Sequence, residues 1–339
     1  MQTNKVIRTV CYFKDALDRA IPERVDEISA RLEARGYIVQ TKRICLKGFA
    51  VKEINKAFNH SAFYLSAGTL GRESVHHQFH DFLDSDHVAF NLDLSSGVHR
   101  TDTDILFNII QNRPAKTFNF SYTFFNAPSS PYFPSAAHGC NGFSIGLQPT
   151  DLSENCNTLD EWLEKVKAAW HEVFDIFQWD ADFLGIDSSI APLFAGKSSF
   201  IHFIKKNYNT FSETLTKALY LQITKFIKSQ NPKPIGLCGI MFPCLEDFEL
   251  AEEYEKGNFS IERNLYLSLH SGLGIDTYPL GIDESPERVF EILCLLQGLA
   301  EKYHKPLSAR FVSDGTAKIG ERTDLHNQYL KDVVVHPLG

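Results

Sequence analysis

The sequence predicts an α/β protein built around a largely parallel sheet or barrel. Short segments rich in β-branched and aromatic residues alternate with segments of roughly 10–20 residues that have helical spacing of apolar side chains. The run at residues 235–242 (IGLCGIMF) is almost continuously apolar, as expected of a strand covered on both faces. Hydrophobic residues make up 43% of the chain and charged residues 22%, which is typical of globular proteins.

The first elements form a β-α-β unit. Residues 5–13 (KVIRTVCYF) favour a strand, and residues 37–44 favour a second one. A helix is expected between them at residues 22–35. It begins with Pro22 and is followed by Gly36, and proline is common at the first position of a helix as glycine is just after its end.

The same alternation continues to the C-terminus. Further strands are expected at residues 87–94, 116–125, 142–147, 183–186, 235–242 and 307–312, with a last one in the tail at 329–335. Further helices are expected at residues 71–83, 101–112, 158–178, 198–206, 212–229, 245–256, 260–269 and 286–303. Thr158 and Glu161 form a capping-box pair, and Asp102 suits the start of its helix. The irregular stretch 126–142 is long enough to suggest a functional loop.

Length, charge and cysteine usage narrow the class of protein. The 339 residues contain no low-complexity linker, so we expect one continuous α/β domain over residues 1–339. The net charge of −8 argues against a general nucleic-acid binder but permits a local pocket for an anion. Without a signal segment or a run of ~18 apolar residues, a soluble cytoplasmic protein is expected. The cysteines are odd in number and lack C-x-x-C spacing, so all are expected to be reduced: Cys11, Cys45, Cys140, Cys156, Cys238, Cys244 and Cys294.

Acidic residues follow two of the expected strands. Asp187 comes after the strand that ends at residue 186, with Ser188 beside it, and Glu246 and Asp247 follow the apolar run 235–242. Ligands collect at the carboxyl ends of parallel strands, so these carboxylates are candidates to bind a cation or act as a base. The structural alternatives are a capped turn at Asp187 and complementation of a helix dipole by the two adjacent acids.

A glycine-rich turn and a cationic segment complete the candidate site. Gly272 and Gly274 precede Asp276 and would let backbone N–H groups approach an anion, although a plain tight turn explains them equally well. Arg310 lies in an expected strand, and Lys318 lies in the loop that follows. A buried arginine nearly always has an acidic partner or binds a carboxylate or phosphate, so both a substrate role and a structural ion pair stay open.

Two other groups are less specific. One expected helix carries several potential metal ligands, with His76 and His80 on one face: Glu73, His76, His77, His80, Asp81 and Asp84. A solvated helix face is the simpler interpretation, because no second set of ligands is evident. His138 and Cys140 suggest a Cys–His nucleophile, but no third residue can be named that would orient the imidazole.

Four blocks resemble the signature blocks of an uncharacterised family, the domain-of-unknown-function family 711: residues 183–194 (FLGIDSSIAPLF), 236–251 (GLCGIMFPCLEDFELA), 272–279 (GLGIDTYP) and 305–320 (KPLSARFVSDGTAKIG). They occur in the family's order, and the resemblance is strongest over about residues 140–325. It implies a large α/β barrel of the pyruvate-formate-lyase-like type, the fold of glycyl-radical enzymes, and no established reaction. The resemblance points to the same acidic and basic residues that were selected above by their positions in or after expected strands: Asp187, Glu246, Asp247, Asp276, Arg310 and Lys318. The sequence departs from the family pattern where Ser271-Gly272 replaces a frequent Cys-Gly and Asp314-Gly315 a frequent Pro-Gly.

These observations together predict an enzyme, a lyase, hydrolase or isomerase, that acts on a small anionic metabolite at a carboxylate-rich site. A divalent cation (Mg²⁺, Mn²⁺ or Ca²⁺) would be bound by Asp187, Glu246 and Asp276. The substrate would be held by Arg310, Lys318, Ser188, Gly272 and Gly274, with Asp247 and Asp187 as catalytic groups. We expect a homodimer, and neither a nucleotide, an iron–sulfur cofactor, a nucleic acid nor a membrane as a partner.

Glycyl-radical chemistry is not expected, because the tail at residues 326–339 lacks the radical-bearing glycine loop of such enzymes. The alternative function is that of a non-catalytic ligand-binding or assembly protein. In that case the same acids would form structural ion pairs with Arg310 and Lys318.

Overall fold

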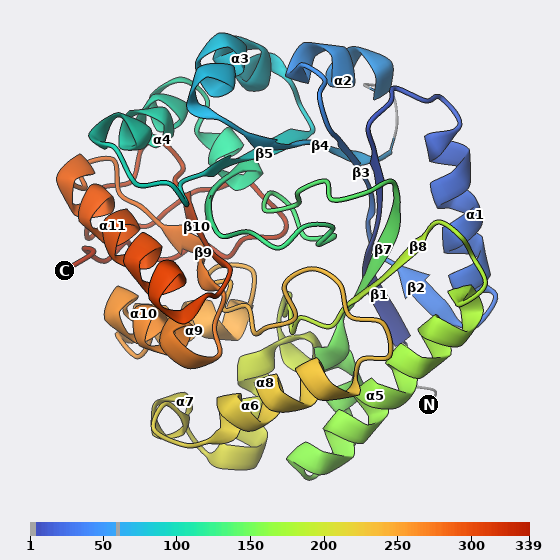
Figure 1. The fold of residues 1–339 in the computed structure, drawn as a ribbon. Coiled ribbons are helices and arrows are strands. Elements are labelled where there is room, and N and C mark those ends of the chain that lie inside the picture. The colour runs from blue at the N-terminus through green and yellow to red at the C-terminus, as the bar shows by residue number, and fades with distance from the viewer. Residues whose placement is uncertain (1–4, 59–61) are drawn as a thin grey trace. The chain divides into compact units, whose positions relative to one another are not determined.

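The computed structural model describes residues 5–58 and 62–339, in which the chain forms two compact units. Unit 1 consists of residues 1–91, 127–190 and 222–239, and unit 2 of residues 92–126, 191–221 and 240–339. Figure 1 labels most of the helices and strands of both. The observed architecture is mixed α/β, as predicted, while the organisation as one domain stays a prediction.

Unit 1 is built on strands in the order β8-β7-β1-β3-β4-β5. Strand β2 pairs with residues 5–7 of β1, whereas β3 pairs with residues 10–14 of the same strand. The neighbours are parallel at β1–β2, β1–β3, β3–β4 and β7–β8, and antiparallel at β1–β7. The strands are β1 (Lys5–Lys14), β2 (Tyr37–Val39), β3 (Lys42–Leu46), β4 (Tyr64–Leu70), β5 (Val88–Asp93), β7 (Gly142–Leu147) and β8 (Phe183–Asp187). The helices are α1 (Ile21–Glu33), α2 (Val51–Phe58), α3 (Arg72–Asp84), α5 (Leu159–Phe177) and α8 (Leu219–Gln230).

Unit 2 has the strand order β6-β10-β9, with β6 antiparallel and β9 parallel to β10. The strands are β6 (Phe120–Phe124), β9 (Gly274–Pro279) and β10 (Leu307–Val312). The helices are α4 (Arg100–Asn112), α6 (Phe200–Tyr208), α7 (Phe211–Thr214), α9 (Phe248–Glu255), α10 (Ile261–His270) and α11 (Pro286–Tyr303). A 3₁₀ segment, Pro114–Asn119, leads into β6, so the strand expected from residue 116 begins only at Phe120.

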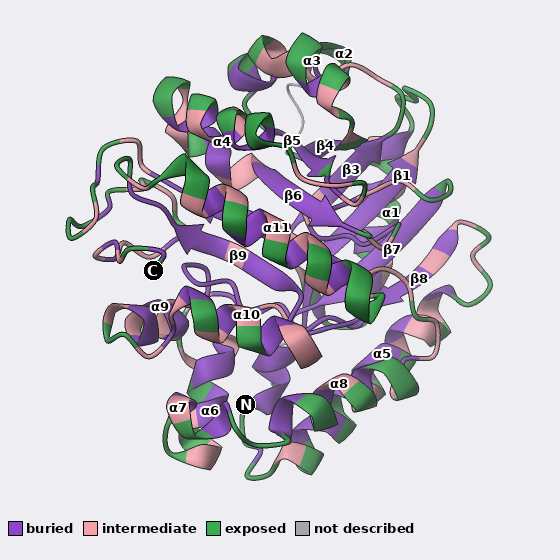
Figure 2. Ribbon diagram, turned by 60° about the vertical axis from the view of Figure 1, so that its left-hand side comes forward, coloured by how far each residue is buried: buried purple, intermediate pink, exposed green. Residues whose placement is uncertain are grey.

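Helix α5 shows how local sequence determines an element. Its N-cap residue Thr158 accepts a hydrogen bond from the Glu161 amide at 3.2 Å, which confirms the predicted N-cap. The Glu161 carboxylate accepts from the Asn157 amide and not from that of Thr158, so the predicted capping box is only half formed. Its buried face includes Trp162, Val166 and Trp170, which follow one another at four-residue spacing. Figure 2 shows the strands almost wholly buried, whereas α5 and α11 alternate buried and exposed residues along their length. The helices therefore cover the sheets with one apolar face each.

Several predicted elements were wrong. The apolar run 235–242 is not a strand, because Gly236 (φ +73°) and Cys238 (φ +46°) adopt left-handed backbone conformations that interrupt extended structure. The supposed glycine-rich turn continues directly into β9. The expected tail strand contributes only an isolated bridge between Val334 and Arg322. Helix α2 and strand β4 were not predicted at all.

A closed barrel is not confirmed. The strand order ends at β8 in unit 1 and at β9 in unit 2, so neither unit closes its own sheet over the described residues. Over the same residues, no helix is long and apolar enough to cross a membrane.

Candidate functional site

Three ionisable residues meet in unit 2: Arg310 on β10, Asp276 on β9, and Glu246 just before α9. The Nε of Arg310 donates to Asp276 Oδ1 at 2.6 Å, and its Nη2 donates to Glu246 Oε1 at 2.5 Å. We call these residues the Arg310 triad. The side chains of Arg310 and Glu246 are 7% exposed and that of Asp276 is 20% exposed. Asp276 is therefore the member most open to water or a ligand.

Backbone pairing brings the triad together. Strands β9 and β10 are parallel, and their register shifts between Ala309 and Phe311, at the position of Arg310. The segment before α9 lies along the other side of β9, where the Cys244 amide donates to the Asp276 carbonyl at 2.9 Å. Two chain segments thus present a carboxylate each to one guanidinium.

Burial and mutual charge determine the electrostatics of the triad. Burial raises the pKa of Asp276, and the Glu246 carboxylate raises it further, while the positive charge of Arg310 opposes both effects. Burial by itself would lower the pKa of Arg310, but the Asp276 and Glu246 carboxylates outweigh it and raise that pKa. Arg310 therefore stays cationic, and its charge opposes the protonation of Asp276 that burial favours.

An aromatic group borders Arg310. The guanidinium carbon lies 5.0 Å from the centroid of the Phe118 ring, and Nη1 donates to the Phe118 carbonyl at 3.4 Å. Phe118 lies parallel to Tyr329 with a centroid distance of 6.4 Å, and Tyr329 stacks in turn on Phe194 at 6.0 Å. These rings have no signature in the sequence, because three distant segments contribute one ring each.

Asp247 has a different role from its neighbour Glu246. It is fully buried and is the N-cap of α9, where its Oδ1 accepts from the amides of Glu249 (3.2 Å) and Leu250 (3.3 Å). The same carboxylate accepts from the Ser199 hydroxyl at 2.6 Å and from the Phe200 amide at 2.9 Å, at the start of α6. Burial raises the pKa of Asp247 to about 6 despite these hydrogen bonds. One side chain therefore caps two helices.

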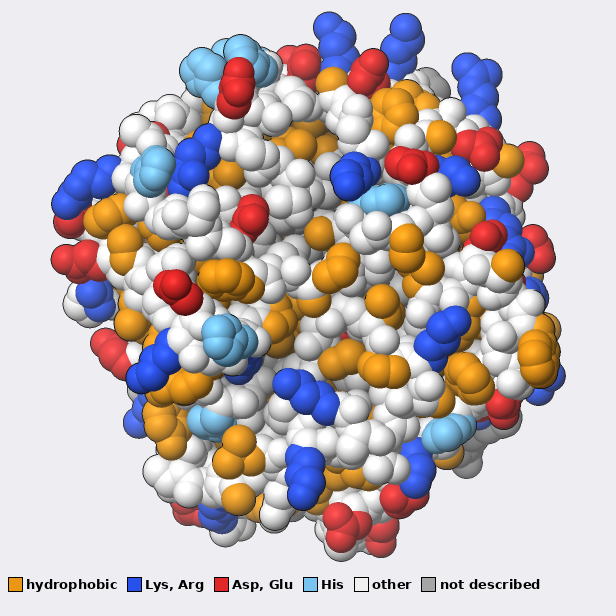
Figure 3. Space-filling view, viewed as in Figure 1, with side chains coloured by type: hydrophobic (Ala, Val, Ile, Leu, Met, Phe, Trp, Pro, Cys, Tyr) orange, Lys and Arg blue, Asp and Glu red, His pale blue; other side chains and the backbone are white. Residues whose placement is uncertain are grey.

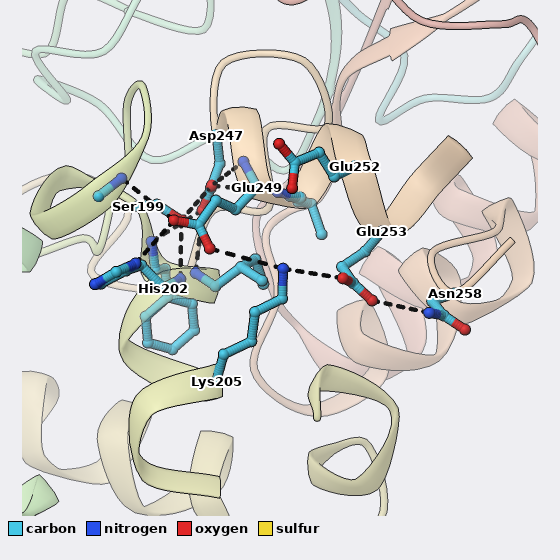
Figure 4. A network of polar contacts seen from close by, with 12 residues as sticks. Ser199, His202, Lys205, Asp247, Glu249, Glu252, Glu253 and Asn258 are labelled. Carbon is cyan, nitrogen blue, oxygen red and sulfur yellow. Dashed lines mark hydrogen bonds and ion pairs between the residues drawn. The ribbon is translucent and has the colours of Figure 1, made fainter. Parts of the chain in front are cut away.

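The polar contacts around Asp247 continue across the surface of the two helices (Figure 4). Glu249 lies 2.9 Å from His202 Nδ1 and 3.7 Å from Lys205 Nζ. Lys205 also pairs with Glu253 at 3.0 Å, and Glu253 accepts from Asn258. These contacts join α6 to α9 and explain why many of the acids in this region are structural.

Asp187 lies in unit 1, where it is fully buried at the end of β8. Its oxygens accept from the hydroxyl groups of Ser130 (2.7 Å) and Ser189 (2.6 Å), and from the Ser189 amide. The amides of Leu237 (3.0 Å) and Cys238 (3.1 Å) donate to it as well. Asp187 thus holds two segments against the end of β8. One is the stretch 126–142, which was predicted to be a functional loop, and the other is the segment after residue 234. Ser130, which the sequence did not single out, belongs to that stretch.

The other predicted substrate-binding residues do not gather around Arg310. Ser188 donates to the carbonyl of Ile227, within unit 1. The Gly272 amide donates to the Leu267 carbonyl at 2.8 Å and so ends α10. Gly274 (φ +105°) lies so close to Ser308 that a Cβ would come within 2.0 Å of its carbonyl oxygen.

Lys318 is exposed, and within the described ranges its ammonium group makes no ion pair.

No group of three or more His, Cys, Asp or Glu residues is placed to hold a metal ion in the parts of the chain that the structure describes. Of the expected metal ligands, Glu246 and Asp276 come together on Arg310, while Asp187 belongs to the other unit. The divalent-cation site therefore stays a prediction. None of the seven cysteines, all of which lie in the described ranges, forms a disulfide, as expected, and Cys140 is the exposed one.

Comparison with known proteins supplies a family. No curated protein matches the chain. A family model described as "Uncharacterised ACR (DUF711)" matches residues 104–326, which is about two thirds of the chain. That range contains the four sequence blocks that resemble the family's signature blocks, and every residue of the Arg310 triad. The protein therefore belongs to the uncharacterised DUF711 family.

Proposed function

We propose that the protein is an enzyme that uses Asp276 to move a proton on a small metabolite, in a lyase, hydrolase or isomerase reaction without a glycyl radical. The observation that carries this proposal is the exposure of Asp276, which at 20% exceeds the 7% of its two partners. A reactive carboxylate needs access to substrate as well as a pKa raised toward the working pH, and burial raises the pKa of Asp276.

The contacts favour Asp276 over the two acids that we expected to be catalytic. Asp187 and Asp247 are fully buried, and backbone amides and hydroxyl groups occupy their oxygens. A carboxylate bound in this way holds chain segments in place and is poorly placed to accept a proton from a substrate. Arg310 would keep Asp276 oriented, and the rings beside it would exclude water from one side.

An anionic metabolite is a further part of the proposal, and a divalent cation is the alternative to proton transfer by Asp276. In that alternative Glu246 and Asp276 would bind Mg²⁺, Mn²⁺ or Ca²⁺ in place of Arg310, since these ions prefer carboxylate oxygens. Released from the acids, Arg310 would then face an anionic group of the substrate. A pyruvate-formate-lyase-like barrel, a cytoplasmic location and a homodimer complete this proposal.

The test combines ligand discovery with turnover. A metabolite panel, with and without Mg²⁺ or Mn²⁺, is screened by thermal shift on the wild type and on Asp276→Asn. Each compound that stabilises the protein is then followed by NMR for conversion. Asp104→Asn is the matched control, because Asp104 is an exposed acid of unit 2 on α4. The proposal requires a compound that the wild type and the control convert and that Asp276→Asn does not.

A second function is favoured by the paired state of the acids. Arg310 contacts two carboxylates, and Asp247 caps two helices, so each acid has a structural role. In a non-catalytic ligand-binding or assembly protein, stabilising compounds would bind the wild type and remain unconverted. That result would overturn the enzyme proposal.

A further inference from the structure

We infer that the exposed face of α3 binds a nitrogen-preferring divalent cation such as Zn²⁺ through His76 and His80. This site lies in unit 1 and is independent of the proposed function, which concerns the Arg310 triad in unit 2. Its ligands would be two imidazole nitrogens, with water completing the coordination sphere.

The helix provides the spacing. Helix α3 is continuous from Arg72 to Asp84, so residues four apart have Cβ atoms about 5–6 Å from each other on one face. Two histidines at this spacing can bind one zinc ion, with Zn–N distances of about 2.0–2.1 Å. The helix buries Val75, Phe82 and Leu83, whereas His76 and His80 are exposed. In Figure 3 histidine side chains gather at the surface over α3.

Both imidazoles are available for an ion. Among the described residues neither His76 nor His80 makes a hydrogen bond or an ion pair, and each has only a ring contact. His76 contacts the His77 ring at 5.9 Å, and His80 contacts the Phe79 ring at 6.3 Å. His77, in contrast, has Glu73 at 3.8 Å. A change of side-chain rotamer in solvent would let His76 and His80 share an ion without loss of a polar contact.

The type and number of ligands determine which ion would bind. Over the described ranges no three candidate ligands converge, so the inference is restricted to a two-histidine chelate. Imidazole binds Zn²⁺, Ni²⁺ and Cu²⁺ well, whereas Mg²⁺ and Ca²⁺ prefer oxygen ligands. The site would therefore discriminate against the hard cations proposed for the Arg310 triad.

Calorimetric titration of the full-length protein with Zn²⁺ tests this inference. The variants are His76→Gln, His80→Gln and the double variant. The matched controls are His77→Gln, on the same helix, and His171→Gln, on an exposed position of α5. Cys140→Ser is a further control, because the exposed Cys140 thiol is an alternative zinc ligand.

A chelate predicts a specific pattern. Either His76→Gln or His80→Gln should weaken the tightest Zn²⁺ site at least tenfold, and the double variant should bind no more weakly than the singles, since one missing ligand already removes the chelate. The three controls should bind like the wild type, and excess Mg²⁺ should not compete. The inference is overturned if His77→Gln or Cys140→Ser weakens binding as much, or if the His76 and His80 variants bind like the wild type.

Discussion

Arg310 and Asp276 share a hydrogen bond of 2.6 Å across neighbouring parallel strands, in which the guanidinium Nε donates to the carboxylate. A buried ion pair seldom contributes much net stability, because desolvation of both charges offsets their attraction. The removal of one partner, however, leaves the other charge buried without compensation. The Arg310 triad is therefore sensitive to single substitutions in a way that can be measured.

Substitution Arg310→Met should be strongly destabilising. It leaves Glu246 and Asp276 without their shared cation, and the two carboxylates then repel each other in a buried site. We expect a loss of about 3–5 kcal/mol in the free energy of unfolding, measured by urea melts at neutral pH. Arg322→Met serves as a control, because Arg322 pairs with Glu255 at the surface and should cost less than ~1 kcal/mol. Equal losses in the two variants would contradict the role assigned to Arg310.

Substitution Asp276→Asn distinguishes an ion pair from a metal site. If Arg310 is the partner, the variant should lose about 2 kcal/mol both with and without EDTA, because Glu246 still compensates Arg310 and Asp276 is partly exposed. If a divalent cation binds here, Mg²⁺ or Mn²⁺ should stabilise the wild type and fail to stabilise the variant. Identical responses of both proteins to the cations would exclude Asp276 as a metal ligand.

Asp247 should make the stability depend on pH in mildly acidic solution. Its pKa of about 6 in the folded protein exceeds the ordinary value of 3.8, so the folded state binds this proton more tightly than the unfolded state does. The resulting stabilisation is complete below about pH 3.8 and is lost as the pH rises through 6. The difference in unfolding free energy between the wild type and Asp247→Asn should therefore fall by about 2 kcal/mol from pH 4 to pH 7.

Ser199→Ala provides the control for that titration. It removes a hydroxyl group that donates to Asp247 and lowers the pKa of that carboxyl, so its cost, about 1–2 kcal/mol, should rise with pH, in the direction opposite to the change for Asp247→Asn. A difference that stays constant with pH for Asp247→Asn would show that Asp247 does not titrate in this range.

Gly236→Ala should disturb the anchor at Asp187. A Cβ on Gly236 would lie 2.4 Å from Asp187 Oδ2 and 2.8 Å from the Ser130 Cα, and the residue has a φ of +73°. We expect a loss of about 2–4 kcal/mol in thermal or urea melts. Gly196→Ala separates the cost of the left-handed backbone from the cost of the steric clash. Gly196 has a similar φ of +67° with open space around it, so this substitution should cost about 1 kcal/mol. Equal costs would mean that the steric clash is relieved.

The thiols should differ in reactivity according to exposure. In the native protein Cys140 should react with a thiol reagent first and Cys294, which is half-buried, more slowly. The other five cysteines are buried and should react only after unfolding. Mass spectrometry of the native and denatured protein counts the modified sites, and Cys140→Ser should abolish the fast phase. A fast phase that persists in this variant would contradict the assignment.

Sequence patterns anticipated part of the contacts around Arg310 for physical reasons, while the site that these residues would form stays a prediction. An arginine in an apolar strand requires an acidic partner, so the pairing of Arg310 was one of two expected outcomes. Which acids it contacts depends on the register shift between β9 and β10, and no local pattern encodes such a shift. The hydrogen bonds to Asp187 come partly from backbone amides, which have no sequence signature. The left-handed conformation of Cys238 made the prediction of a strand at 235–242 wrong. Glycine adopts this conformation readily, whereas a cysteine in an apolar run gives no indication of it.

The double cap formed by Asp247 links the local openings of two helices. The first turns of α6 and α9 depend on one carboxylate, so fraying at the start of α9 removes the acceptor from the α6 amides, and fraying of α6 exposes the carboxylate that caps α9. The amide protons of Phe200 and Leu250, fifty residues apart in sequence, should therefore become exposed to solvent in one cooperative opening. In native-state hydrogen exchange these two amides would share a single opening free energy and a single dependence on denaturant.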